Sequence, residues 1–296
     1  MSFLKSVEAV LRTPKFLLSE SSEDYYEFLG DDVLEGQHEG FSDPSKPLWL
    51  NLGYWHEART YPAACEAMAT LVGDAAHLGP GKELLDVGFG FAEQDLFWLA
   101  RYDVAKITGL NITQLHVDRA RERVRERGLE ARMDLRLGSA TDVPFADGSF
   151  DAVTALECAF HFDTRDRFFE QALRVLRPGG YLATADVLPS PGHGELSMVN
   201  RLALKRWSTP VANVYDRDEY RRRLEALGFV DVTVQSIRGD VFPGATRYAE
   251  LRKAGKSMKE AVVSLSAADV EQVYGLENWE PTGLTDYVIF GARKPG

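Results

Sequence analysis

Residues 83–92 read Glu-Leu-Leu-Asp-Val-Gly-Phe-Gly-Phe-Ala, and this stretch decides the fold of the chain. Its first half, 83–87, is the short apolar run of a strand buried in a parallel sheet. Gly88 and Gly90 follow, and a residue without a Cβ allows backbone angles and a close approach to a ligand that other residues block. Residues 91–102 then have the pattern of a helix, whose first turn would offer unpaired N–H groups to an anionic or polar ligand.

The glycine turn by itself fits more than one interpretation. A dinucleotide-binding loop carries a third glycine, whereas Ala92 and Glu93 occupy that part of this loop, which disfavours a nicotinamide dehydrogenase. The other alternative is an ordinary tight turn between a strand and a helix, with no ligand. The rest of the chain has to decide between these interpretations.

Strands and helices alternate along the chain after this turn. Further strands are predicted at 106–110, 133–137, 152–155, 181–185, 230–237 and 284–292, and helices at 113–127 and 164–176. Repeated strand–helix units indicate a sheet with helices on both faces. We therefore predict an α/β fold with a mostly parallel seven-stranded sheet.

Two segments lie outside the alternation and are predicted to cover the ligand. Residues 1–55 are expected to form an N-terminal lid or cap, and 56–296 a catalytic domain with a helical lid inserted at 189–280. The apolar stretch LWLNLGYW, at 48–55, is interpreted as a wall over the ligand, with a packed loop as the alternative. Helices are predicted at 3–11, 61–78, 196–207, 216–227, 248–263 and 267–274.

Composition narrows the function classes and the expected partners. The formal net charge is -11, which argues against nucleic acid and anionic membranes because phosphate binding needs a basic surface. The sequence has no apolar run near the roughly 20 residues that span a bilayer, and 1–18 lacks the apolar core of a signal peptide. Cys65 and Cys158 are expected to be reduced, so we predict a cytoplasmic protein. A monomer or a homodimer is expected.

Polar side chains follow the predicted strands at the edge where parallel sheets bind their ligands. Asn111 ends the second strand, 25 residues after Asp86, where a polar side chain is placed to hold ribose hydroxyls. Asp or Glu is usual there, but an amide still offers a donor and an acceptor. Ser139, Ala140 and Thr141 follow the third strand, Glu157, Cys158 and His161 follow the fourth, and Asp186 ends the fifth.

The motifs LLDVGFG, GLN, GSATDVPFADGSFDAV and LRVLRPGGYLATAD resemble those of the class I S-adenosylmethionine-dependent methyltransferases. The stretches LNLGYW, DVGFGFAEQDLFWL, ECAFHFDTRDRFF, GFVDVTVQSIR and ARKPG look more narrowly like the macrolide-sugar O-methyltransferases of actinomycete antibiotic pathways. The likeness covers most of 48–296. It implies a Rossmann-like class I methyltransferase fold, S-adenosylmethionine as cofactor and a small natural-product acceptor.

The resemblance also implies roles for single residues. Gly88 and Gly90 would line the methionine part of the cofactor, Asn111 and Ile112 would hold ribose and adenine, and Ser139, Ala140 and Thr141 would lie by adenine. Tyr54, Gln94 and Glu157 would lie near the methionine head or the cleft. The full set expected around the cofactor is Tyr54, Asp86, Gly88, Gly90, Gln94, Asn111, Ile112, Gln114, Ser139, Ala140, Thr141 and Glu157.

His161 and Asp186 are the candidate catalytic residues. A hydroxyl is a poor nucleophile while it is protonated, and a general base speeds its reaction by about 10²–10⁴. His161 is predicted at the cleft edge, and Asp186, at the end of the neighbouring strand, is expected to orient its imidazole. The alternatives are a structural histidine and a turn or cap aspartate. We predict no metal site, because His, Asp and Glu do not show a metal-ligand spacing.

The leading hypothesis is an enzyme that methylates a hydroxyl of a glycosylated or polyketide natural product. A C-methyltransferase or a carboxylate O-methyltransferase would keep the cofactor and change the acceptor. A cyclase of a different class would keep the fold and hold S-adenosylmethionine as a structural ligand. Methyl transfer yields S-adenosylhomocysteine in step with product, whereas the cyclase yields none.

Overall fold

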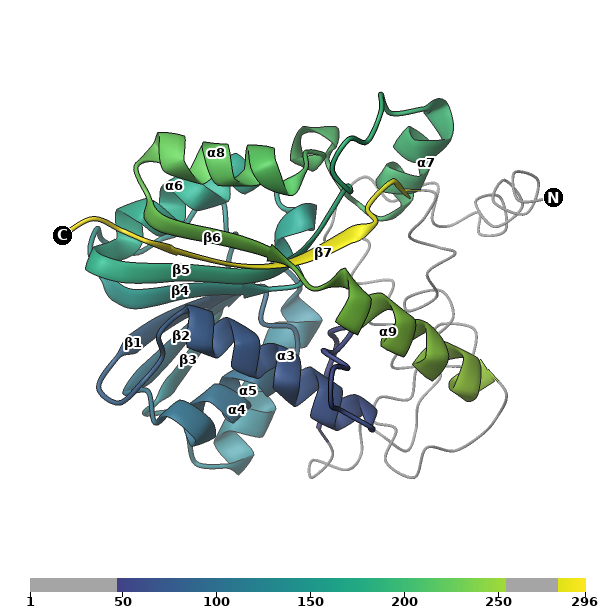
Figure 1. Ribbon diagram of the computed structural model, residues 1–296. Helices are drawn as coiled ribbons and strands as arrows, with labels where there is room; N and C mark the ends of the chain where they lie inside the picture. The colour runs from purple at the N-terminus through teal and green to yellow at the C-terminus, as the bar shows by residue number, and fades with distance from the viewer. Residues whose placement is uncertain (1–46, 254–281) are drawn as a thin grey trace.

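The computed structural model describes residues 47–253 and 282–296, in which seven strands form one sheet of order β3-β2-β1-β4-β5-β7-β6 (Figure 1). The strands are β1 (Glu83–Val87), β2 (Lys106–Asn111), β3 (Met133–Leu137), β4 (Phe150–Leu156), β5 (Leu176–Leu188), β6 (Val230–Ser236) and β7 (Asp286–Arg293). Adjacent strands among β1 to β5 pair in parallel, and β7 runs antiparallel to both its neighbours, β5 and β6. The predicted α/β fold and its mostly parallel seven-stranded sheet are confirmed.

Helices cover both faces of the sheet (Figure 1). One face carries α3 (Tyr61–Ala75), α4 (Glu93–Tyr102) and α5 (Gln114–Glu126), and the other carries α6 (Arg165–Val175) and α8 (Arg217–Leu227). Two further helices, α7 (Met198–Arg206) and α9 (Arg238–Lys253), lie outside these layers. The apolar residues of the sheet divide accordingly into two buried clusters, one under each helical layer.

The helices begin where the sequence supplies side-chain caps. Thr60 accepts the amide of Ala63 at the start of α3, and the Asp216 carboxylate accepts two amides at the start of α8. Ser197 and Asn200 form a reciprocal capping box at the start of α7. These caps satisfy N–H groups that have no partner within the helix.

Several elements begin at other residues than predicted, among them α4, β5 and α9. Helix α4 starts at Glu93, because Ala92 has a left-handed backbone (φ 60°) that cannot continue into the helix. Strand β5 starts directly after α6, so Pro178-Gly179-Gly180 lies in the strand instead of ending the helix. Helix α9 starts at Arg238, ten residues before the predicted start, and includes Pro243. Within this helix Gly244 packs closely on Trp55, since a Cβ on Gly244 would overlap the ring of Trp55.

Some predictions fall outside the described residues. They are the helices at 3–11 and 267–274, the second half of the helix at 248–263, and most of the lid segment 1–55. Within the predicted insertion 189–280, α8 and β6 belong to the helical layer and the edge of the sheet. The described part that lies beyond the carboxyl end of β5 is the stretch 189–216 with α7 and the 3-10 turn Val211–Asn213.

Candidate active site

The glycine loop joins β1 to α4 through three left-handed backbone positions. Gly88, Gly90 and Ala92 have φ angles of 74°, 55° and 60°. A Cβ on Gly88 would lie 2.5 Å from Sγ of Cys158, and one on Gly90 would lie 2.9 Å from Cδ1 of Leu50. Both glycines are thus required by two protein segments that approach the loop, in addition to any ligand.

A buried carboxyl pair lies under this loop. The hydroxyl of Thr154 donates to Oδ1 of Asp86 at 2.7 Å, and the amide of Gln94 donates to Oδ2 at 3.1 Å. Asp95 is also fully buried, and burial raises the pKa of both carboxyls, with the charge of Asp86 raising that of Asp95 further. Two carboxylates cannot both stay charged at such a site, so the pair retains a proton. Asp86 and Gln94, two predicted cofactor residues, are therefore buried in a hydrogen-bonded pair that connects the end of β1 to the first turn of α4.

Glu157 connects the loop to the segment 47–55. It follows β4 with a left-handed backbone (φ 57°), and its Oε2 accepts the amide of Leu52 at 2.7 Å. Burial raises the pKa of Glu157 to about 8, so the carboxyl is largely protonated at neutral pH. At the other end of the segment, Glu93 accepts the amide of Leu48 at 2.6 Å. Two carboxyl side chains thus hold the predicted wall beside the glycine loop, where Leu50 lies against Gly90.

Among the remaining predicted cofactor residues, Asn111 and the stretch 139–141 are adjacent, whereas the side chain of Gln114 lies apart on a helix surface. Asn111 and the stretch 139–141 lie together, because the amide of Gly138 donates to the Asn111 carbonyl at 2.9 Å. The Asn111 side chain accepts the Thr113 amide at 3.1 Å, and the hydroxyls of Ser139 and Thr141 lie 2.9 Å apart. Ile112 and Tyr54 are half-buried, and Ala140 is buried. Gln114 is exposed and bonds Asp118 along α5, which places its side chain on the helix surface.

His161 ends the 3-10 turn Ala159–His161 that follows Glu157 and Cys158. Its side chain is buried, its ring centroid lies 3.9 Å from that of Phe160, and its Nδ1 lies 3.4 Å from the carbonyl oxygen of Ser208. Burial lowers the pKa of His161 to about 4. The imidazole is therefore neutral at physiological pH and able to accept a proton.

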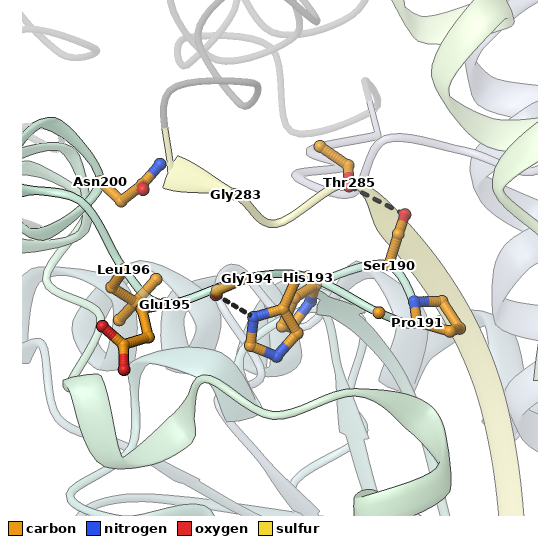
Figure 2. A pocket seen from close by; sticks show the side chains of 11 residues that line it. Ser190, Pro191, His193, Gly194, Glu195, Leu196, Asn200, Gly283 and Thr285 are labelled. Carbon is orange, nitrogen blue, oxygen red and sulfur yellow. Dashed lines mark hydrogen bonds between the residues drawn. The ribbon is translucent and has the colours of Figure 1, made fainter.

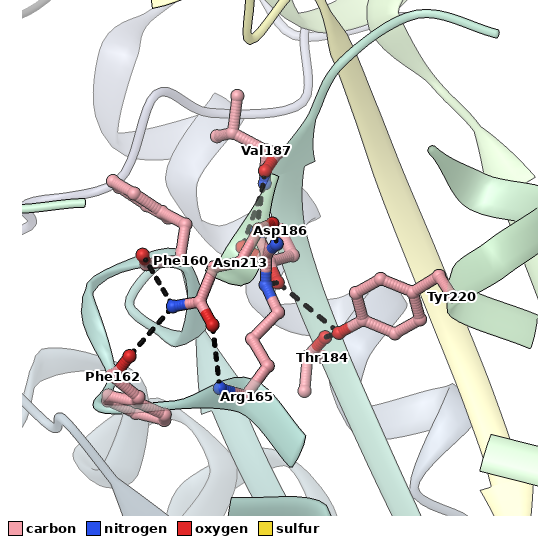
Figure 3. A network of polar contacts seen from close by, with 8 residues as sticks. All are labelled: Phe160, Phe162, Arg165, Thr184, Asp186, Val187, Asn213 and Tyr220. Carbon is pink, nitrogen blue, oxygen red and sulfur yellow. Dashed lines mark hydrogen bonds and ion pairs between the residues drawn. The ribbon is translucent and has the colours of Figure 1, made fainter. Parts of the chain in front are cut away.

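The structure corrects the role expected of Asp186. In the part of the chain described here, the Asp186 carboxylate bonds Nε of Arg165 at 2.8 Å, the hydroxyl of Tyr220 at 3.2 Å and the amide of Val187 at 2.9 Å, as Figure 3 shows. The described hydrogen bond of His161 goes instead to the Ser208 carbonyl. A buried guanidinium needs a counter-ion, so Asp186 neutralises Arg165 instead of orienting the imidazole.

Sequence reasoning missed several members of this network. Arg165 is fully buried, and Asn213 joins it to the turn that carries His161 (Figure 3). Two arginines, Arg165 and Arg167, stand in the first turn of this amphipathic helix, and the pattern did not distinguish the buried one from the exposed one. Thr154 and Asp95, which lie beside Asp86 under the glycine loop, were also missed, because their sequence patterns are those of an ordinary strand and an ordinary helix.

A pocket of about 410 Å³ lies beyond the ends of β5 and β7 (Figure 2). The loop after β5 and the residues before β7 line it, and the hydroxyls of Ser190 and Thr285 in this lining hydrogen-bond each other at 2.9 Å. His193, Glu195 and Asn200 add polar groups, and Pro189, Pro191 and Leu196 add apolar surface. On α7 nearby, the apolar side chains of Met198 and Leu202 are 78% and 48% exposed. The lining therefore offers hydrogen-bonding and apolar groups together, as small-molecule sites do.

Residues 47–253 and 282–296 contain no group of three or more His, Cys, Asp and Glu side chains that could hold a metal ion. Within the same residues, none of the helices has the length and apolar character to cross a membrane. Cys65 and Cys158 are both free and buried.

Comparison with known proteins places this site in a family. A family model described as a methyltransferase domain matches residues 85–184. The erythromycin 3''-O-methyltransferase of Saccharopolyspora erythraea is 36% identical over 281 residues, which cover 92% of this chain and 89% of that protein. The 27-O-demethylrifamycin SV methyltransferase of Amycolatopsis mediterranei is 30% identical, covering 87% and 95%. The crystal structure of the cyclase SpnF, 23% identical, covers 93% of this chain and 96% of its own, with a TM-score of 0.70.

The residues at the carboxyl edge fit S-adenosylmethionine. Asn111 uses its side-chain oxygen for the Thr113 amide, which leaves its N–H groups as the donors for a ribose hydroxyl. Leu137, at the end of β3, is apolar and 50% exposed, and such a surface suits the face of an adenine ring. The left-handed turn at Gly88 and Gly90 leads into the first turn of α4, and the N–H groups of a helix N-terminus suit a carboxylate such as that of the methionine part. The chain belongs to the class I S-adenosylmethionine-dependent methyltransferases, in the group that includes the erythromycin 3''-O-methyltransferase.

Proposed function

We propose that this enzyme methylates a hydroxyl of a glycosylated or polyketide natural product, with His161 as the general base. The observation that carries the proposal is the setting of His161. It follows the β4 strand end beside Glu157, it is neutral at physiological pH, and one of its nitrogens faces a carbonyl oxygen. The names of the two relatives, which are O-methyltransferases of antibiotic compounds, support a hydroxyl on such a compound as acceptor.

S-adenosylmethionine supplies a methyl group that the sulfonium already makes electrophilic, so the protein needs to place the acceptor and take up a proton. With S-adenosylmethionine bound, Nε2 of His161 would take up the proton that the acceptor hydroxyl loses as it gains the methyl group. The segment 47–55, held by Glu93 and Glu157, lies beside the glycine loop and would help to exclude water from the cleft. Holding the reactants in line supplies much of the rate enhancement of such a reaction.

The pocket beyond β5 is the candidate site for the part of the acceptor remote from the methylated hydroxyl. Its volume of about 410 Å³ lies within the range of small-molecule sites. Hydroxyl, amide and carboxylate groups suit the hydroxyls of a sugar, and the proline and leucine side chains suit the less polar face of the ring. The exposed Met198 and Leu202 would contact an apolar aglycone.

The test is incubation of the enzyme with methyl-labelled S-adenosylmethionine and a panel of glycosylated macrolides, free sugars, aglycones and carboxylic acids. We expect label in one hydroxyl-bearing class and one S-adenosylhomocysteine per methylated product. Label on a carbon atom or on a carboxylate would show that the acceptor is not a hydroxyl. Conversion of a polyene without formation of S-adenosylhomocysteine would show that the enzyme is a cyclase and not a methyltransferase.

A further inference from the structure

The side chain of Asn213 is fully buried and binds both sides of the turn that carries His161. Its amide nitrogen donates to the carbonyl of Phe160 at 3.1 Å and to that of Phe162 at 2.7 Å. Its oxygen accepts the backbone amide of Arg165 at 2.9 Å. Carbonyls only accept and an amide N–H only donates, so a single orientation of the Asn213 side chain satisfies all three bonds. Figure 3 shows this side chain between the turn and Arg165.

The direction of the His161 ring determines which nitrogen carries its hydrogen. Nδ1 lies 3.4 Å from the carbonyl oxygen of Ser208, a long hydrogen bond, and the backbone of Trp207 also interacts with the ring. A carbonyl oxygen has no hydrogen to give, so the Ser208 contact favours the tautomer of the neutral ring that carries its hydrogen on Nδ1. In that tautomer Nε2 holds the lone pair that takes up a proton.

We propose that Asn213 is a positioning residue that clamps the His161 turn so that the Ser208 carbonyl holds the hydrogen on Nδ1 and Nε2 serves as the proton acceptor. This inference rests on the proposed role of His161 and adds the residues that impose it. Asn213 and Ser208 both belong to the stretch 189–216, whose start lines the pocket. The base is therefore assembled only when this stretch is packed in place, which couples catalysis to the acceptor side of the cleft.

Asp186 has an indirect part in the same device. It neutralises Arg165, whose guanidinium donates to the backbone carbonyls of Asn213 and Val187. Arg165 thus ties the end of β5 to the residue that clamps the turn. The Asp186 carboxylate thus stabilises the position of Arg165, whereas the Ser208 carbonyl determines the tautomer of His161.

Nitrogen-15 NMR of the full-length enzyme labelled at histidine tests the inference without requiring turnover. The chain has six histidines, so the His161 signal is assigned by its loss in His161→Gln. In the wild type we expect the Nδ1–H tautomer throughout neutral pH. In Asn213→Ala we expect a mixture of tautomers and a His161 pKa displaced toward its ordinary value. An Nε2–H tautomer in the wild type overturns the proposal, whatever the variant does.

Kinetics give a second and independent measurement. In Asn213→Ala, turnover is expected to fall about ten- to hundredfold, as for a misplaced catalytic group, while the Kd for S-adenosylhomocysteine stays within about twofold. The matched control is Gln171→Ala, which removes another side-chain amide, on α6, whose oxygen accepts from the backbone amide of Val143 and from the guanidinium of Arg174. An Asn213→Ala enzyme with wild-type tautomer and turnover would overturn the clamp.

The same data separate failure of the inference from failure of the proposed function. If His161 is the Nδ1–H tautomer but His161→Ala keeps full turnover, the base assignment fails and the positioning geometry stands. If Asn213→Ala does not fold, Asn213→Asp keeps the oxygen that accepts from Arg165 and loses the two donor bonds, and the same tautomer shift is expected. A wild-type NMR signature in that variant would also count against the clamp.

Discussion

Nε of Arg165 lies 2.8 Å from Oδ2 of Asp186, and neither side chain has any solvent-exposed surface. The guanidinium also lies over the rings of Tyr215 and Tyr220, at 5.3 and 5.6 Å. Breaking such a pair leaves an uncompensated charge in the interior. The main contribution of Asp186 is therefore to the stability of the fold, as the counter-ion of Arg165.

Asp186→Asn is expected to lower the free energy of unfolding by about 3–5 kcal/mol, because Arg165 loses its counter-ion in a buried site. Urea unfolding at neutral pH measures this change. Glu122→Gln breaks the exposed pair with Arg119 and is expected to leave stability nearly unchanged. An Asp186→Asn protein of full stability but low turnover would return Asp186 to the catalytic role first expected of it.

His161→Ala is expected to lower turnover by about 10²–10⁴ while cofactor affinity stays near wild type, because the imidazole acts as general base toward the acceptor. Only neutral imidazole takes up the proton. Since burial lowers the pKa of His161 to about 4, the wild-type rate should be flat through neutral pH and fall as pH drops through about 4. Turnover with saturating acceptor, measured across pH, checks both expectations.

The control for this prediction is His77→Ala. His77 stacks on Tyr181, with ring centroids 4.0 Å apart, and Tyr181 precedes Asp186 by five residues along β5, so the loss of His77 should leave turnover unchanged. A rate that falls less than about tenfold in His161→Ala, about 1.4 kcal/mol of barrier, would indicate that proximity alone drives the reaction. A fall in rate centred near pH 6.5 would contradict the buried setting of the ring.

Glu157→Gln is expected to change how stability depends on pH. Burial raises the pKa of Glu157 to about 8, so between its unfolded pKa and about 8 the folded state binds more protons than the unfolded state. Stability attributable to this group is then present at acidic pH and is lost as pH rises, by roughly 2–4 kcal/mol. Gln still accepts the Leu52 amide and cannot ionise. Urea unfolding at pH 5 and pH 8 should show that the free energy of unfolding of the variant, relative to that of the wild type, is higher at pH 8 than at pH 5. An equal difference at both pH values would refute this.

Gly88→Ala is expected to cost more stability than Gly148→Ala. Both glycines are left-handed, with φ of 74° and 64°, and that conformation costs an alanine about 1–2 kcal/mol. A Cβ on Gly148 meets nothing within 4 Å, so this variant isolates the backbone cost, whereas a Cβ on Gly88 would lie 2.5 Å from Cys158. Calorimetry should show weaker S-adenosylhomocysteine binding for Gly88→Ala alone. Equal stability and affinity in the two variants would mean that the loop adjusts freely.

The order of the elements was predictable from the sequence because it depends on local patterns. Buried strands in a parallel sheet are short apolar runs, and Thr60, Asp216 and Gly228 mark helix ends by interactions within a few residues. The start of α9 was not predictable, since Pro243 reads as a break while the packing of Gly244 on Trp55 involves residues far apart in the chain. Element boundaries set by tertiary contacts carry no local signal.

The sequence by itself determined the family, the cofactor class and the strand ends around which the site is built, because the glycine turn and the polar residues after each strand are contiguous motifs. Only the tertiary structure decided which partner each polar side chain takes. Asp186 and His161 lie on neighbouring strand ends, yet Arg165 takes the carboxylate and the Ser208 carbonyl takes the imidazole. Hydrogen-bond partners in a buried site depend on direction and desolvation over a few ångströms, and residues 21 and 47 positions apart meet there only after the chain has folded.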